Sequence, residues 1–108
     1  MMSKKLNYYV TDSGEEPFKK WFTKLEKRTQ LILIKFIKRV AGGGSKKNIK
    51  SLRGGVFEIK IHHGSGYRVY FAQEGDQMIL LLLGGNKSSQ KSDILRAKKY
   101  WSEYGEKK

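Results

Sequence analysis

The hydrophobic period of this chain changes once, from helical to extended, and that change limits the folds open to it. Before Gly42, apolar residues recur every three or four positions, which predicts amphipathic helices. After Gly55, apolar and polar residues alternate in three segments, 56–62, 67–73 and 77–83, separated by glycine-containing turns. Strands joined by such short turns form an antiparallel meander. The sequence therefore predicts the α+β class, with helices and an antiparallel sheet in separate parts of the chain.

The part of the chain before Gly42 is expected to begin with a short strand that precedes its helices. Residues 6–10 form a β-prone stretch that is followed by a turn. Pro17 suits a first helical turn, and Ser13 and Glu16 before it have the spacing of a capping box. A second helix is predicted over 29–41, with its apolar residues on one stripe. The expected order so far is an N-terminal strand followed by two helices.

Glycines and serines mark the remaining boundaries. Gly42–Gly44 end the second helix and lead into a mobile basic loop that begins at Ser45. After the meander, a last helix is predicted over 88–104, capped by Ser88 or Ser89, and it closes the sheet. The chain of 108 residues has room for one compact core, so we expect a single domain over 1–108.

Composition narrows the class of partner. Lys and Arg number 23 against 10 Asp and Glu, a formal charge of +13, which favours nucleic acid as the partner. Aromatic residues make up 12%, too many for a disordered basic tail. The absence of Cys excludes disulfide scaffolds and thiol nucleophiles, and we expect a cytoplasmic protein. The longest apolar run, 78–83, is far shorter than the about 20 residues of a membrane span, so no membrane contact is expected.

Alternation sorts the polar residues of the meander onto one face. The apolar residues of segment 56–62 are expected to face the helices, so their polar neighbours point to an open face. That face collects two cations, an imidazole, a carboxylate and a phenol: Lys60, Arg68, His62, Glu58 and Tyr70. Such groups can bind a phosphate and move a proton, as ribonuclease chemistry without a metal requires. The alternative is a solvated face with a cross-strand ion pair.

The two histidines are adjacent, so at most one of them lies on this face. His63, at the strand end, is the more suitable for a structural role, and His62 for the site. Neither has the spacing of a histidine metal site. The sequence therefore predicts no metal and no cofactor.

Further polar residues flank the face. A basic run precedes the meander, and a glycine-rich turn over 84–91 leads into the last helix, where N–H groups and lysines can hold a phosphate. The turn lacks the ending of a nucleotide-binding Walker loop. The predicted RNA contacts are Lys46, Lys47, Lys50, Arg53, Lys87, Gln90 and Lys91. The alternative is a solvated surface beside an ordinary capped turn.

Four stretches of the chain resemble one group of proteins in order and spacing. They are Pro17-Phe18 with Trp21, the segment Ile49–Lys60, the segment Gly64–Phe71, and Leu83–Lys87 with Gln90 and Asp93-Ile94. Together these motifs resemble the RelE/ParE superfamily of toxins from toxin–antitoxin modules. The likeness is closest to the HigB-like or phage Gp49-like addiction module killer proteins, and it covers nearly the whole chain.

The resemblance implies a RelE-like fold and a type II toxin. It implies an endoribonuclease that cuts mRNA on the translating ribosome without a metal and leaves a 2′,3′-cyclic phosphate. The implied partners are mRNA, the ribosome and a cognate antitoxin, expected to be of the helix-turn-helix type. Arg68 matches the phosphate-binding arginine of the superfamily, and Lys60 matches a basic position on the preceding strand.

The sequence departs from RelE-type nucleases in three places. Glu58 stands where those enzymes carry a second lysine, the turn 87–91 contains no arginine, and Asp93 stands in the region of a tyrosine. The general base is therefore open among His62, Glu58 and Tyr70. Two other functions stay open as well: a ParE-like toxin that inhibits gyrase without nuclease activity, and a basic nucleic-acid-binding module without catalysis.

Overall fold

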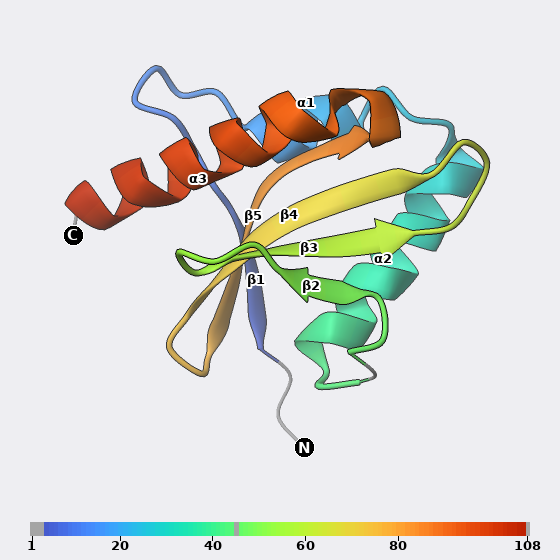
Figure 1. The fold of residues 1–108 in the computed structure, drawn as a ribbon, viewed down its shortest axis with the longest axis horizontal. Coiled ribbons are helices and arrows are strands. Elements are labelled where there is room, and N and C mark those ends of the chain that lie inside the picture. Colours follow the sequence, from blue (N-terminus) through green and yellow to red (C-terminus); the bar gives the residue numbers. More distant parts are fainter. Residues whose placement is uncertain (1–3, 45, 108) are drawn as a thin grey trace.

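The computed structural model describes residues 4–44 and 46–107. Within them, five strands form one sheet in the order β1-β5-β4-β3-β2 (Figure 1). The strands are β1 (Lys5–Tyr8), β2 (Ile49–Ser51), β3 (Val56–Ile61), β4 (Tyr67–Glu74) and β5 (Met78–Asn86). The helices are α1 (Pro17–Phe22), α2 (Lys27–Ala41) and α3 (Gln90–Glu106), with the 3-10 turn η1 (Lys87–Ser89) before α3. This architecture confirms the predicted α+β class.

The antiparallel meander is present as β3, β4 and β5, and β1 adds to it in parallel to β5. β5 continues to Asn86, so the glycine-rich segment predicted as a turn belongs in part to a strand. The strand can continue because its two glycines leave room for neighbours. A Cβ at Gly84 would overlap the Trp21 ring, and one at Gly85 would overlap the Asp93 carboxylate.

β2 is a strand that was not predicted from the sequence. It lies inside the predicted basic loop and pairs antiparallel with β3, with Ile49 opposite Ile59 and Lys50 opposite Glu58. Three residues are too few for an alternation signal, and two of these three are polar. Ser45, predicted to begin the loop, lies outside the described residues.

The helix boundaries differ from the predicted ones at their caps. Glu16 occupies the N-cap position of α1 without a side-chain hydrogen bond, and the Ser13 hydroxyl contacts Thr11 instead, so the predicted capping box is wrong. α2 begins two residues before the predicted Thr29. At the last helix the side-chain cap comes from Asn86, which accepts a hydrogen bond from the Ser89 N–H at 3.1 Å.

Helices cover both faces of the sheet, which corrects the expected open face. α1 and α2 pack on the apolar residues of β3 to β5, as predicted, in a core that contains Leu33, Ile37, Ile59, Ile61, Val69, Phe71 and Leu81. α3 packs on the opposite face, in a core that contains Val56, Tyr70, Ala72, Leu80, Leu82 and Ala97. Figure 1 shows α3 in front of the end of β5 and α1 behind it. None of the described helices is long and apolar enough to cross a membrane.

The turn between β2 and β3 contains a strained residue. Arg53 has φ of 70°, and it is the one non-glycine residue with positive φ in the described ranges. A side chain in this left-handed region costs roughly 1 kcal/mol, whereas glycine adopts it freely. Arg53→Gly is therefore expected to raise the free energy of unfolding by about 0.5–1 kcal/mol in urea denaturation. Gly54→Ala, at φ of 65° with no atom near its Cβ, is the opposite control and should destabilise. Equal free energies of unfolding for the wild type, Arg53→Gly and Gly54→Ala would show that the backbone at Arg53 is not strained.

Candidate active site

A groove of about 490 Å³ lies between β2, β3, β4 and the start of α3. We call it the basic groove; it is lined by Lys47, Asn48, Ile49, Lys50, Glu58, Lys60, His62, Arg68 and Gln90. Four of the five predicted catalytic residues therefore share one groove with three of the predicted RNA contacts. The register explains part of this arrangement, because Lys60 on β3 lies directly opposite Arg68 on β4.

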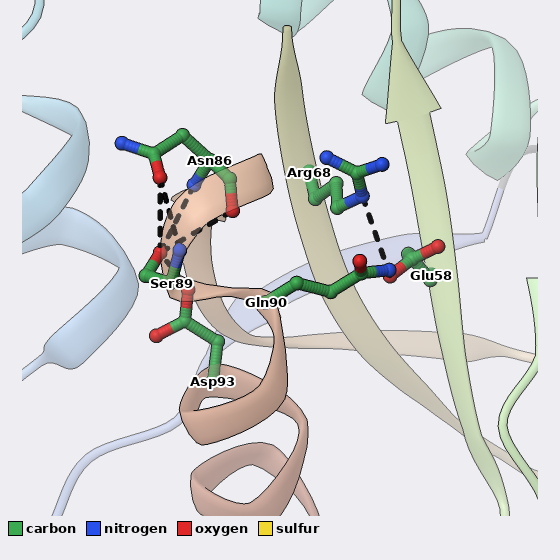
Figure 2. A network of polar contacts seen from close by, with 6 residues as sticks. All are labelled: Glu58, Arg68, Asn86, Ser89, Gln90 and Asp93. Carbon is green, nitrogen blue, oxygen red and sulfur yellow. Dashed lines mark hydrogen bonds and ion pairs between the residues drawn. The ribbon is translucent and has the colours of Figure 1, made fainter.

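Glu58 and Arg68 form a buried ion pair at the inner wall of the groove. Arg68 Nε lies 3.7 Å from Glu58 Oε2, and the two side chains are only 8% and 3% exposed. The same carboxylate oxygen accepts a hydrogen bond of 2.9 Å from the Gln90 side-chain amide (Figure 2). Gln90 was predicted to contact RNA, and the structure shows this additional role for it. The carboxylate is thus held from β4 and from the first residue of α3.

The Arg68 guanidinium has unmet hydrogen-bonding capacity. Its Nε is buried and has no hydrogen-bond partner in the described part of the chain, because 3.7 Å is too long for a hydrogen bond. Figure 2 shows the two terminal nitrogens directed away from Glu58. Nε faces Glu58, so an anion with two oxygens would be bound by the two terminal nitrogens of the guanidinium. The groove can therefore hold a phosphate at Arg68.

Tyr70 lies under α3, completely buried, although the sequence analysis placed it on an open face. Its hydroxyl also has no hydrogen-bond partner among the described residues. Burial, and next the negative charge of Glu58, raise the pKa of the Tyr70 hydroxyl far above its usual value near 10. The phenol is consequently protonated at neutral pH. This excludes the phenolate as a general base under physiological conditions.

Glu58 and Arg68 are likewise buried, and Gln90 of α3 contacts Glu58, while Lys60 and His62 remain exposed at the rim of the groove. His62 and Lys60 also line an adjoining hollow of about 220 Å³, together with Lys87. His63 points elsewhere: it is half-buried, and its ring stacks on Tyr67 with 6.2 Å between the ring centroids. The two adjacent histidines therefore occupy different environments.

The predicted RNA contacts fall into two groups. Lys47, Lys50 and Gln90 line the basic groove, and Lys87 lines the adjoining hollow. Lys46, Arg53 and Lys91 are exposed and line neither of the two. No group of three or more His, Cys, Asp or Glu side chains suited to a metal ion occurs within the described ranges.

A second hollow, of about 370 Å³, lies between α1, the end of β5 and α3, and no pattern in the sequence predicted it. Asp93 lines it with its carboxylate almost fully buried, at 5% exposure. The Ser89 hydroxyl donates a hydrogen bond of 2.5 Å to Asp93 Oδ2. The spacing of Ser89 and Asp93, four residues apart at a helix start, was the signal available in the sequence.

Two comparisons relate this chain to known proteins. The model of the phage-derived Gp49-like protein family (DUF891) matches residues 20–100, a range that contains every residue lining the basic groove. An uncharacterized protein of Haemophilus influenzae (strain ATCC 51907 / DSM 11121 / KW20 / Rd) is 39% identical over 89 residues. That alignment covers 82% of this chain and 89% of the Haemophilus protein.

Proposed function

Because this chain belongs to the Gp49-like family, a RelE/HigB-like family of toxins associated with toxin–antitoxin modules, we propose that it is a metal-independent endoribonuclease that cuts mRNA on the ribosome. The family implies an antitoxin as its partner. The observation that carries the proposal is the buried Arg68, which Glu58 holds at Nε while its two terminal nitrogens are directed away from Glu58, in a groove that also contains Lys50 and Lys60. Such a group is suited to the phosphate of an RNA backbone.

In the proposed reaction, Arg68 and Lys60 hold the scissile phosphate from two neighbouring strands. The 2′-oxygen attacks the adjacent phosphorus, an O–P bond forms, and the bond from phosphorus to the 5′-oxygen breaks. The products are a 2′,3′-cyclic phosphate and a 5′-hydroxyl. Negative charge on the phosphoryl oxygens increases in the transition state, and a preorganised guanidinium stabilises it. Glu58, held by Gln90, orients Arg68 toward this position.

We assign the proton transfers to the exposed members of the groove. His62 accepts the proton of the 2′-hydroxyl, and the Lys60 ammonium donates a proton to the departing 5′-oxygen. Glu58 is less suitable as the base, because its carboxylate is 3% exposed and already contacts Gln90 and Arg68. Tyr70 is unsuitable because its raised pKa keeps it protonated.

The direct test uses the purified chain, freed of metal ions by prior dialysis, with ribosomes programmed with a defined mRNA in a buffer whose only divalent cation is the Mg²⁺ that ribosomes require. We expect cleavage within codons, new 5′-hydroxyl ends and 2′,3′-cyclic phosphate ends. Inhibition of gyrase with intact mRNA would instead assign the ParE-like function. Binding of RNA without any cleavage or toxicity would assign the chain to the non-catalytic binding modules.

A further inference from the structure

The second hollow, which we call the aromatic cleft, has the features of a binding site. The residues that matter are Trp21, Gly84, Gly85, Asp93, Arg96 and Tyr100. They come from three elements, with α1 on one side, α3 on the other and the end of β5 between them. The cleft therefore has two walls and a floor of strand backbone.

The floor is a free sheet edge. The pairing of β1 with β5 ends at Leu81, so the last residues of β5 have β4 on one side only. The faces of this segment are covered, because the Trp21 ring lies against Gly84 and the Asp93 carboxylate lies against Gly85. Backbone N–H and C=O groups on an unpaired edge can hydrogen-bond a ligand. A flat molecule can thus approach the main chain along this edge, and not over the faces that Trp21 and Asp93 cover.

Flat side chains form the walls. Trp21 is half-exposed and packs against Gly84. Opposite it, Tyr100 stacks on Tyr9 with 5.0 Å between centroids, and Arg96 lies over Tyr100, with its Nη2 donating a hydrogen bond of 3.0 Å to the Tyr100 hydroxyl. Exposed Arg96 is thereby held as a flat, charged surface. Nucleobases stack on aromatic rings and on guanidinium planes.

A buried carboxylate is the polar group of the cleft. Asp93 forms no ion pair within the described residues, although the chain carries a charge of +13. Its Oδ2 accepts from Ser89, which leaves Oδ1 as an acceptor for a ligand. Figure 2 shows Asp93 and Gln90 extending from different sides of the first turn of α3, Gln90 toward Glu58 and Asp93 away from it. Buried charges in proteins are normally paired, so this carboxylate points to a ligand that donates hydrogen bonds.

The cleft and the basic groove are neighbours across one turn of chain. Ser89 lines the cleft and the next residue, Gln90, lines the groove. Lys24 adds a cation to the cleft, where Lys20 forms an ion pair of 3.4 Å with Glu15. We propose that the aromatic cleft binds one base of the RNA whose phosphate lies in the basic groove, and that Asp93 selects guanine; this inference rests on the proposed function. Guanine fits because its Watson–Crick edge presents two adjacent donors, the ring N–H and the amino group, to an acceptor-only carboxylate.

The test measures binding without cleavage. Short single-stranded RNAs with 2′-O-methyl riboses carry guanine, inosine or uracil at one position and are titrated by fluorescence anisotropy. The wild-type chain should bind the guanine RNA about 10- to 100-fold more tightly than the uracil RNA, as is typical of hydrogen bonds to a charged group. Inosine, which lacks the amino group, should fall between them. Asp93→Asn should lose this preference while its affinity for the uracil RNA stays the same.

Two further variants separate stacking from charge. Arg96→Lys keeps the positive charge and removes the planar guanidinium on which a base could stack. It should therefore weaken binding of all three RNAs. Lys98→Ala, an exposed change on the same helix outside the cleft, should leave the preference unchanged. Thermal melting of each variant verifies that it is folded.

The possible outcomes distinguish the two proposals. A guanine preference that survives Asp93→Asn, in a chain that still cleaves mRNA through Arg68, would overturn the base site and leave the proposed function intact. If Asp93→Asn weakens the antitoxin complex and leaves the preference for guanine RNA unchanged, the cleft binds a protein partner. That result would overturn the inference. A wild-type chain that neither binds nor cleaves RNA would overturn both.

Discussion

Arg68→Ala is expected to reduce mRNA cleavage roughly 100-fold or more and to lower the free energy of unfolding by about 3–5 kcal/mol. The first effect follows from losing the guanidinium that would hold the phosphate. The second follows because Glu58, 3% exposed, would be left as a buried charge without its partner. Alternation places Arg68 on an open face, where truncation would leave the fold nearly intact; its burial beside Glu58 changes that expectation.

Two companion variants separate the two effects of Arg68→Ala. Arg68→Lys keeps a positive charge beside Glu58, so it should retain most of the stability while losing much of the cleavage, because an ammonium lacks the planar fork. The double variant Glu58→Gln/Arg68→Gln removes both charges and should be more stable than Arg68→Ala, yet remain inactive. Cleavage on programmed ribosomes and thermal melting are measured for each. An Arg68→Lys protein that cleaves like the wild type would contradict the role of the planar guanidinium, and an Arg68→Ala protein that does so would show that Arg68 does not hold the phosphate.

His62→Ala is expected to reduce cleavage about 100-fold or more at unchanged stability, because general acid–base catalysis contributes about 100- to 10,000-fold. His62 is exposed, so its loss leaves no cavity. The matched control is the adjacent His63→Ala. His63 stacks on Tyr67, so its removal should lower stability slightly and leave the cleavage rate of the folded protein unchanged. Single-turnover cleavage together with melting distinguishes the two. Equal cleavage rates for both variants would exclude His62 from proton transfer. Glu58 would then be the remaining candidate for the general base.

The sequence was sufficient for the elements with a clear hydrophobic period. The helical stripe over 29–41 and the alternation in the meander both reflect burial of one face, and both elements are present. The sequence could not show which sheet face the last helix covers, because α3 buries little apolar surface of its own beyond Ala97 and a few half-buried residues. Glu58, Arg68 and Tyr70 therefore looked exposed from alternation alone.

The sequence predicted which polar side chains share a face of the sheet, and it did not predict how deeply they are buried. Alternation brought Glu58, Lys60 and Arg68 onto one face correctly, since neighbouring strands share their register. The contact from Gln90 to Glu58 and the burial of Asp93 depend on how α3 packs, and on the glycines of β5 that admit it. Such contacts between residues distant along the chain leave no periodic pattern in a single sequence.

The parallel pairing of β1 with β5 also affects the order in which the protein can form. Lys5 lies opposite Met78, and β4 lies between β5 and β3, so the first strand has no partner until most of the chain has been synthesised. Contacts of such long sequence separation form late, and a chain grows from its N-terminus. Gln90, which fixes Glu58, follows later still. A nascent chain therefore lacks the complete groove until the last helix has emerged, so an incomplete chain is expected to be inactive in any reaction that needs this groove.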